Sequence, residues 1–310
     1  MILVWVLVST IGLAVAVWGS RRAVSSASRL ALGFGVSPFV VGAVVLSVGT
    51  DLPEIANSIV ASVSGNGDIN LGDSVGSAVT QITLVLGLLA FLVGRIGVPR
   101  RRVQAVGLLT ALALVVLAVM VADGWMSRAN GLILIALWVG MSVFLARRKL
   151  VASDPVLVVR SERKARLVVT TMLSLGVVAL GATVAVLSLV EVAEILELPE
   201  FLVSFFGLAI GTSLPELVVD YTALRQGQRD LAVGELFGSS MVDASLSVGA
   251  GPAVAPVAVT ATYALWSTLS AAVVVLVVTL VLVRRGHHDR WSGALFIVIY
   301  LAMYPLLLNA

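Results

Sequence analysis

Long runs of uncharged residues recur along the whole chain and limit the folds that are open to it. Runs longer than about 18 residues match the length of α-helix that crosses a bilayer. Of the 310 residues, 59% are hydrophobic and only 12% are charged. One water-soluble core could not hide this much apolar surface. The sequence therefore predicts an all-α integral membrane protein.

The uncharged runs divide into ten expected spans, at 2–19, 33–63, 70–94, 103–122, 127–146, 167–190, 201–224, 231–250, 258–283 and 291–309. Lys and Arg test this layout, because cytoplasmic loops carry an excess of both. When alternate loops are assigned to opposite sides, all 20 Lys and Arg except Arg128 fall on one side. We expect that side to be cytoplasmic, with both termini outside the cell and the protein in the plasma membrane. The basic charge then reflects orientation, so no nucleic-acid partner is expected.

A hexapeptide occurs twice, as Gly-Thr-Asp-Leu-Pro-Glu at 49–54 and Gly-Thr-Ser-Leu-Pro-Glu at 211–216. The same offset of 162 relates Asp68 to Asp230, Gly72 to Gly234, Asp73 to Glu235, Ser77 to Ser239 and Gln81 to Asp243. Each half of the chain holds five spans, an odd number, so the two copies must cross the membrane in opposite directions. The sequence thus predicts two inverted five-helix repeats, a transporter architecture with its site at the repeat interface.

This interpretation divides the chain into three parts. Residues 1–146 form the first five-helix repeat, with an ion-site segment at 47–81. Residues 147–166 form a basic cytoplasmic linker. Residues 167–310 form the second repeat, with an ion-site segment at 209–243.

The proline in each hexapeptide opens a helix inside the membrane. Proline has no N–H and its ring clashes with the carbonyl four residues earlier. Pro53 therefore frees the carbonyl of Gly49, and Pro215 frees that of Gly211. A free carbonyl is costly in the hydrocarbon region unless something satisfies it, and a desolvated cation would do so.

The other polar groups of the hexapeptides complete an all-oxygen cage. Thr50 and Thr212 add hydroxyl oxygens, and Glu54 and Glu216 add carboxylates just past each break. A plain helix kink is the alternative. However, a charge near the bilayer midplane costs about 2.5 kcal/mol or more, which favours a functional role. Oxygen ligands of this kind suit Ca²⁺ and Na⁺.

The helix after each hexapeptide offers further polar groups. Ser77 and Ser239 are followed four residues later by Gln81 and Asp243, on the same helix face. Asp243 is a candidate ligand or proton site, whereas Gln81 is either a ligand or a packed amide that bridges helices. The glycines that precede the serines are expected to allow close helix approach; they are Gly72, Gly76, Gly234 and Gly238.

Four more acids have weaker expected roles. Asp51 shares a helix face with the first hexapeptide glutamate and is expected to join the site. Asp220 either lines an inner access path or faces water. Asp73 and Glu235 are expected near helix N-termini, where capping and the helix dipole favour a carboxylate.

These motifs resemble the alpha repeats of the cation/calcium exchanger superfamily, specifically its prokaryotic sodium/calcium exchanger branch. The resemblance implies Ca²⁺ exchange against Na⁺ by alternating access, with the first and sixth helices sliding past a rigid core. It implies that Glu54 and Glu216 are central ligands shared by both ions. The flanking groups that it implies are Thr50, Thr212, Ser77 and Ser239 with the carbonyls of Ser47 and Ala209, and Gln81 and Asp243 form the central polar pair.

The sequence departs from this family pattern at several positions. Asp51 replaces the usual serine, Gln81 replaces an asparagine, and Ala78 and Ser240 replace the asparagines after each Gly-Ser pair. Asp51 adds a fourth acid to the expected cage, and four adjacent carboxylates would not all ionise without cations. We therefore hypothesise that protons compete at this site more than in a typical sodium/calcium exchanger.

Competing functions remain open from the sequence alone. The alternative to Na⁺ coupling is an H⁺- or K⁺-coupled divalent cation antiporter of the same fold. An intramembrane enzyme is disfavoured, because the chain has no Cys and its two histidines, His287 and His288, lie outside the spans. A compact charged cage also suits alternating access better than a channel. No cofactor is expected, and Ca²⁺ and Na⁺ are the expected transported ions. The lipid bilayer is the expected environment, and no obligate protein partner is evident.

Overall fold

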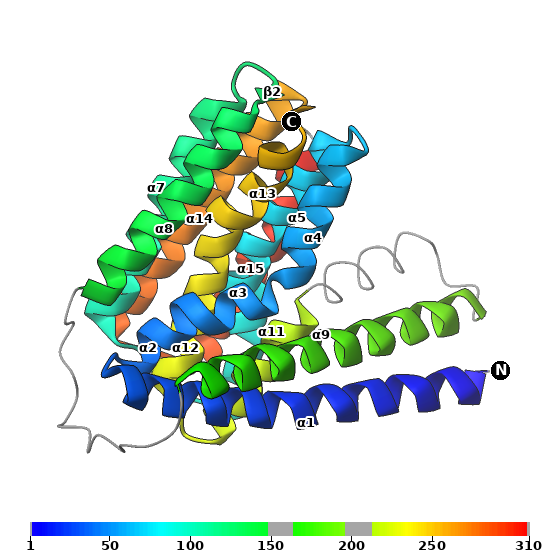
Figure 1. Ribbon diagram of the computed structural model, residues 1–310, viewed down its shortest axis with the longest axis vertical. Coiled ribbons are helices and arrows are strands. Elements are labelled where there is room, and N and C mark those ends of the chain that lie inside the picture. Colours follow the sequence, from blue (N-terminus) through cyan, green and yellow to red (C-terminus); the bar gives the residue numbers. More distant parts are fainter. Residues whose placement is uncertain (1, 148–163, 196–212, 309–310) are drawn as a thin grey trace.

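A computed structural model describes residues 2–147, 164–195 and 213–308, and helices dominate it (Figure 1). The only strands in these ranges are four short pieces that pair two by two. The expected all-α fold is confirmed for the described residues. Six of their helices are long and apolar enough to cross a membrane, and a seventh span results if one bent helix pair is counted.

Two long helices lie side by side across one end of the molecule (Figure 1). They are α1 (Ile2–Phe34) and α9 (Lys164–Ile195). Small residues bring their backbones together: a Cβ at Gly12 would lie 2.7 Å from the carbonyl oxygen of Gly181. A hydrogen bond of 2.8 Å joins the Ser26 and Thr171 hydroxyls. The pairing of early α1 residues with late α9 residues makes the two helices antiparallel.

The length of α1 corrects one expectation from the sequence. The first span was expected to end near residue 19, with its arginines in a loop. Instead the helix continues to Phe34, so Arg21, Arg22 and Arg29 lie on it. At 1.5 Å per residue, a helix of 33 residues is about 50 Å long, which is longer than the hydrocarbon region is thick.

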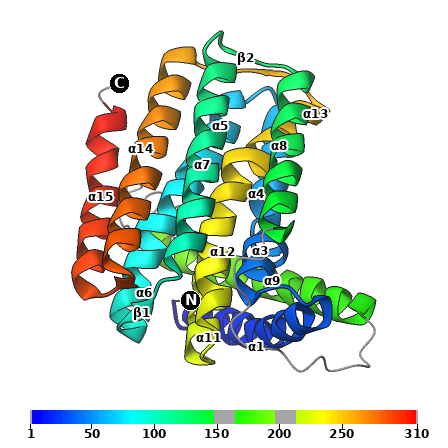
Figure 2. The same ribbon diagram turned by 90° about the vertical axis from the view of Figure 1, so that its left-hand side faces the viewer.

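A bundle of long helices forms the rest of the molecule. Figure 2 shows α7 beside α14, with α8 and α15 on either side. The bounds are α7 (Arg100–Val121), α8 (Arg128–Arg147), α14 (Ala261–Arg285) and α15 (Arg290–Leu308). A Cβ at Gly107 would lie 2.1 Å from the Thr279 hydroxyl, so α7 and α14 are in close contact.

The first hexapeptide lies in a broken helix. The pieces are α2 (Pro38–Val41), the π-helix η1 (Gly42–Leu46), α3 (Ser47–Thr50) and α4 (Leu52–Val63). The chain bends by 48° between Thr50 and Leu52. Pro53 stands at the start of α4, where its missing N–H is tolerated. The expected helix break is therefore present.

The helices that follow the two hexapeptides have matching bounds. In the first half they are α5 (Gly67–Thr80), the π-helix η2 (Gln81–Val85) and α6 (Leu86–Val93). In the second half α11 (Leu214–Arg225) corresponds to α4 and precedes α12 (Arg229–Val242), the π-helix η3 (Asp243–Ser247) and α13 (Val248–Val254). The offset of 162 carries α4, α5 and η2 onto α11, α12 and η3 without a shift. The sequence repeat is thus also a repeat of local backbone structure.

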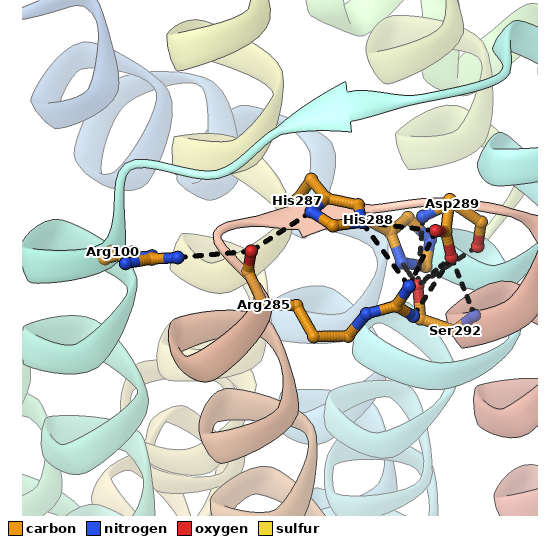
Figure 3. A network of polar contacts seen from close by, with 6 residues as sticks. All are labelled: Arg100, Arg285, His287, His288, Asp289 and Ser292. Carbon is orange, nitrogen blue, oxygen red and sulfur yellow. Dashed lines mark hydrogen bonds and ion pairs between the residues drawn. The ribbon is translucent and has the colours of Figure 1, made fainter.

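Two short strand pairs tie the loops at the ends of the bundle. β1 (Ile96–Gly97) pairs with β4 (His287–His288), and β2 (Trp125–Met126) pairs with β3 (Val257–Ala258), both antiparallel. Beside β4, Arg285 forms an ion pair of 2.7 Å with Asp289, and Arg100 donates to the Arg285 carbonyl at 3.2 Å (Figure 3). These contacts join the ends of α7, α14 and α15.

Candidate ion-binding site

The break after α3 places two acids inside the protein. Asp51 occupies the break itself, and Glu54 lies in the first turn of α4. Their exposed fractions are 0% and 1%. Because Asp51 is outside both helices and Glu54 follows it by three residues, both side chains can reach the same space. Asp51 therefore lies beside Glu54, and its expected role as an ion ligand stays a prediction.

Glu216 from the second hexapeptide meets this pair. One carboxylate oxygen from each of Asp51, Glu54 and Glu216 lies within 4.8 Å of the other two, a spacing that one metal ion could bridge. Glu216 is in the first turn of α11 and fully buried. Two glutamates 162 residues apart therefore converge on one point, as the repeat predicted. We call these three residues the cage.

A polar layer borders the cage on the helices after each hexapeptide. Gln81 begins η2 and Asp243 begins η3, and both are fully buried. The Gln81 amide nitrogen lies 3.5 Å from an Asp51 carboxylate oxygen. π-Helical turns are often found at functional sites, and here they stand at the same position of both repeats. Gln81 is thus placed beside the cage, where it can orient Asp51.

The hydroxyls expected at the site divide into two groups. Thr50 and Ser239 lie together, with their hydroxyl oxygens 3.4 Å apart. Ser77 is buried in α5, and Ser47 is buried in α3, where its hydroxyl donates to the Ala43 carbonyl at 2.9 Å. The Ser47 carbonyl accepts the Asp51 N–H at 3.0 Å, and the Thr50 hydroxyl oxygen lies 3.1 Å from it.

Two expected site residues, Thr212 and Ala209, lie outside the described residues. The first described residue of the second hexapeptide is Ser213, the counterpart of Asp51. Ser213 is 2% exposed, and its hydroxyl has no hydrogen-bond partner among the described residues. The sequence analysis did not single it out, although the repeat offset alone points to it.

Glu235 does not have the capping role expected of it. α12 begins at Arg229, so Glu235 lies nearly two turns inside the helix and is fully buried. One of its carboxylate oxygens accepts the Thr50 hydroxyl at 2.8 Å and the Ser239 hydroxyl at 3.3 Å. The spacing of Glu235, Ser239 and Asp243 by four residues each would have indicated this shared face.

Asp73 and Asp220 also differ from expectation. Asp73 lies well inside α5, not at its N-terminus, and accepts the Asn57 side-chain amide at 2.7 Å. Asp220 is fully buried on α11, so the alternative that it simply faces water is wrong.

A comparison with known protein families shows which family the chain belongs to. The family model described as "Sodium/calcium exchanger protein" matches residues 4–147 and 166–308. The chain belongs to the sodium/calcium exchanger protein family. The resemblance drawn from the two hexapeptides is confirmed, and so is the expectation of a transporter in place of an enzyme, because the family is one of exchangers.

Several relatives extend this match over nearly the whole chain. This exchanger is similar to inner membrane protein YrbG of Escherichia coli, with 31% identity over 261 residues that cover 79% of this chain and 78% of the relative. It is similar to the sodium/calcium exchanger MaX1 of Methanosarcina acetivorans, with 27% identity over 349 residues that cover 99% of each. Among solved structures it is similar to the sodium-calcium exchanger NCX_Mj soaked with zero Na⁺ and Ca²⁺, at a TM-score of 0.82 and 28% identity, covering 98% of this chain and 99% of that one.

The exchanger holds an unusual amount of buried negative charge around its cage. Carboxylate oxygens without a hydrogen-bond donor among the described residues occur on six acids, namely Asp51, Glu54, Glu216, Asp220, Glu235 and Asp243. The ion pairs between described residues join Arg102 to Asp230 and Arg285 or His287 to Asp289. None of these pairs between described residues includes one of the six acids. Buried charge of this kind is costly unless a cation or a proton offsets it.

Close packing holds the exchanger's second-repeat helix against the broken helix. A Cβ at Gly234 would lie 2.2 Å from the Phe39 carbonyl oxygen, and one at Gly238 would lie 2.3 Å from the Ala43 Cα. Both glycines therefore have the expected role. Gly72 and Gly76 do not, because a Cβ at either would meet no atom within 4 Å. They border a cavity of about 180 Å³ that Tyr263 and Tyr300 also line, so the expected close approach there is wrong.

Proposed function

We propose that this chain is a secondary active antiporter that exchanges Ca²⁺ against Na⁺ by alternating access. The observation that carries the proposal is the cage of Asp51, Glu54 and Glu216, with an oxygen of each within 4.8 Å of the others and no exposed fraction above 1%. Carboxylate oxygens are the ligands that Ca²⁺ prefers. The relatives MaX1 and NCX_Mj carry the name of sodium/calcium exchangers. Ca²⁺ and Na⁺ are the transported ions, and no cofactor is needed.

The roles of the site residues follow from this function. Glu54 and Glu216 are the central ligands for both ions, and Asp51 and Asp243 supply further carboxylates. Gln81 orients the central layer. The groups that line flanking sodium sites are Thr50, Thr212, Ser77 and Ser239 with the carbonyls of Ser47 and Ala209.

The proposed membrane architecture is ten transmembrane helices in two inverted five-helix repeats. Residues 1–146 form one repeat, with its ion-site segment at 47–81, and residues 167–310 form the other, with its segment at 209–243. The basic linker at 147–166 is cytoplasmic, and both termini are outside the plasma membrane. The matching bounds of α4, α5 and η2 with α11, α12 and η3 support the repeat.

This topology can be tested at two exposed loop positions that are repeat counterparts, Ser64 and Gln226. The chain contains no cysteine, so single-cysteine variants need no background substitutions. We expect a membrane-impermeant thiol reagent to label Ser64→Cys from outside the cell and Gln226→Cys only after access to the cytoplasm. Labelling of both from the same side would contradict inverted repeats.

The long helix pair α1 and α9 is the moving part in this proposal. Leu175 of α9 covers the first hexapeptide: a Cβ at Gly49 would lie 2.2 Å from its Cδ1 atom. Gly12 and Gly181 let the backbones of α1 and α9 come into close contact, so the pair can move as one body. A shift of the pair would carry Leu175 off Gly49 and change access to the cage.

One observation favours the alternative of H⁺ coupling with the same fold. Asp51 and the other five buried acids carry more negative charge than one Ca²⁺ can offset, so protons can enter the cycle. Calcium uptake into proteoliposomes with an opposing gradient of sodium, potassium or protons decides between them. Na⁺ coupling predicts uptake only with internal sodium. Uptake driven by a proton or potassium gradient would favour the alternative, and uptake without any opposing gradient would indicate a channel.

A further inference from the structure

Two buried acids beside the cage are not assigned as ligands in the exchange reaction proposed above. Asp220 lies on α11, one turn after Glu216, and Glu235 lies on α12. Both side chains are fully buried. Charged groups are rarely buried without a compensating partner, and neither residue caps a helix or meets solvent.

The contacts of Glu235 leave one of its oxygens open. Its Oε1 atom accepts the Thr50 hydroxyl at 2.8 Å, a shorter distance than that hydroxyl has to the Leu46 or Ser47 carbonyl, 3.2 and 3.1 Å. The Ser239 hydroxyl lies 3.3 Å from the same oxygen. The Oε2 atom has no donor among the described residues. The hydroxyls therefore fix the carboxylate in one orientation with Oε2 free.

Asp220 supplies two more open oxygens at the same place. Neither of its carboxylate oxygens has a donor among the described residues. The charged groups that face the Asp220 carboxyl are Glu235 first, then Glu216 and Asp51, all acidic. The pair thus presents three unpartnered carboxylate oxygens in a fully buried space. Such a set is unstable as two bare anions in contact and suits a hard cation.

We propose that Asp220 and Glu235 form a further cation site, separate from the cage, that binds a hard cation such as Na⁺. This inference deepens the proposed function and rests on it, because it assumes that the cage itself takes the transported ions. Both residues lie close to the cage. Glu235 contacts Thr50 and Ser239, and Asp220 follows Glu216 by one helical turn. A cation here offsets charge that a single Ca²⁺ in the cage leaves uncompensated.

The shared hydroxyls couple the occupancy of this site to that of the cage. Without a cation, the negative Glu235 carboxylate attracts the Thr50 and Ser239 hydroxyls, which donate to it. A cation bound at Glu235 offsets that charge, so the hydroxyls are held less strongly and can turn toward the cage. Each ion therefore changes the affinity of the other, by the same factor in both directions.

The test counts bound ions on the purified full-length chain. Equilibrium dialysis with radiolabelled sodium, and separately with radiolabelled calcium, compares the unchanged protein with the double variant Asp220→Asn/Glu235→Gln. The amides keep the shape of the side chains, and retained calcium binding shows that the double variant is folded. Asp73→Asn is the matched control, because Asp73 is a partly buried acid at the position of the first repeat that corresponds to Glu235.

We expect the double variant to bind one sodium ion fewer per protein at saturation, and the control to lose none. An unchanged sodium count in a folded double variant would overturn the site. The site would also be overturned if the number of bound sodium ions stayed the same and only the pH dependence of calcium binding changed, since the pair would then hold a proton. If the unchanged protein fails to exchange calcium for sodium in liposomes but the variant still loses one bound sodium, the proposed function fails and this site stands.

Discussion

The Ser240 hydroxyl donates a hydrogen bond to the Ala78 carbonyl oxygen, at 2.9 Å, across an offset of 162 residues. Ser240 and Ala78 are therefore counterparts in the two repeats. Counterparts touch each other only where the two repeats meet, close to the axis that relates them. The bond lies next to Ser77 and Ser239 in the sequence, so this meeting point is beside the ion-binding layer.

Loss of that bond should weaken the junction between the repeats. Ser240→Ala leaves the buried Ala78 carbonyl without this donor, and we expect a loss of about 1 kcal/mol in the free energy of unfolding. Chemical unfolding of the detergent-solubilised protein measures it. The control is Ser74→Ala, because the Ser74 hydroxyl is buried without a partner among the described residues and its removal should cost nothing. Equal destabilisation by both changes would mean that the bond contributes nothing.

The two hexapeptide glutamates should be indispensable for transport. Glu54→Gln or Glu216→Gln replaces a charged ligand by a neutral amide in a fully buried cage, so we expect calcium exchange to fall to the background of empty liposomes. The proteins should remain folded, since neither carboxylate has a hydrogen-bond donor among the described residues that the change would strand. Size-exclusion profiles check the fold. Exchange at more than a tenth of the normal rate in either variant would show that the glutamate is not a central ligand.

The two repeats should respond differently to an added methyl group. In Gly238→Ala the new Cβ would lie 2.3 Å from the Ala43 Cα, so the backbone must move and we expect a loss of about 1 to 3 kcal/mol. In Gly76→Ala, the counterpart position, no atom lies within 4 Å of the new Cβ. We expect that variant to be as stable as the unchanged protein or slightly more so, since alanine favours a helix. Thermal unfolding compares the two, and a similar loss in both would contradict the packing described.

The buried His288 ring should make the free energy of unfolding depend on pH. Burial lowers the pKa of His288 to about 4 from its ordinary value of 6.5, despite the hydrogen bond with the Leu86 carbonyl. Between these values the unfolded chain binds a proton and the folded protein does not, so stability falls as the pH falls from 6.5 toward 4. The full effect is on the order of 3 kcal/mol.

The measurement is thermal unfolding across that pH range. His288→Gln removes the titrating ring and should flatten the dependence, whereas His287→Gln should preserve it. Asp289 contributes at lower pH: burial opposes its ionisation, but Ser292 hydrogen bonds and Arg285 outweigh it and lower its pKa to about 2. A slope that persists in His288→Gln down to pH 4 would assign it to another group.

The sequence analysis predicted the elements that depend on local pattern. Apolar runs predicted helices, the paired Pro residues predicted the break at Asp51, and the offset of 162 predicted that Glu54 and Glu216 meet. These predictions hold because a charged side chain in an apolar span is costly in the hydrocarbon region and so faces the protein interior. Asp51 was expected to join the site because it shares a helix face with Glu54.

The errors concern features that depend on neighbours in space. Glu235 was taken for a helix-end acid because the start of α12 was placed too late; it lies inside, bonded to Thr50. Gly72 and Gly76 have the same spacing as Gly234 and Gly238, but only the second pair faces another backbone. Spacing alone does not tell which helix, if any, comes close. The continuation of α1 to Phe34 was not predicted, because the arginines after residue 19 were interpreted as part of a loop.

The central claim is that one Ca²⁺ sits between Asp51, Glu54 and Glu216. The most direct measurement is anomalous X-ray scattering from crystals of the protein grown with Ca²⁺ and little Na⁺. The account predicts a calcium peak with an oxygen of each of these three residues at about 2.3 to 2.6 Å, and its loss in high Na⁺. A calcium peak elsewhere in the membrane region, or the carboxylates of Glu54 and Glu216 facing different sides with calcium bound, would contradict it.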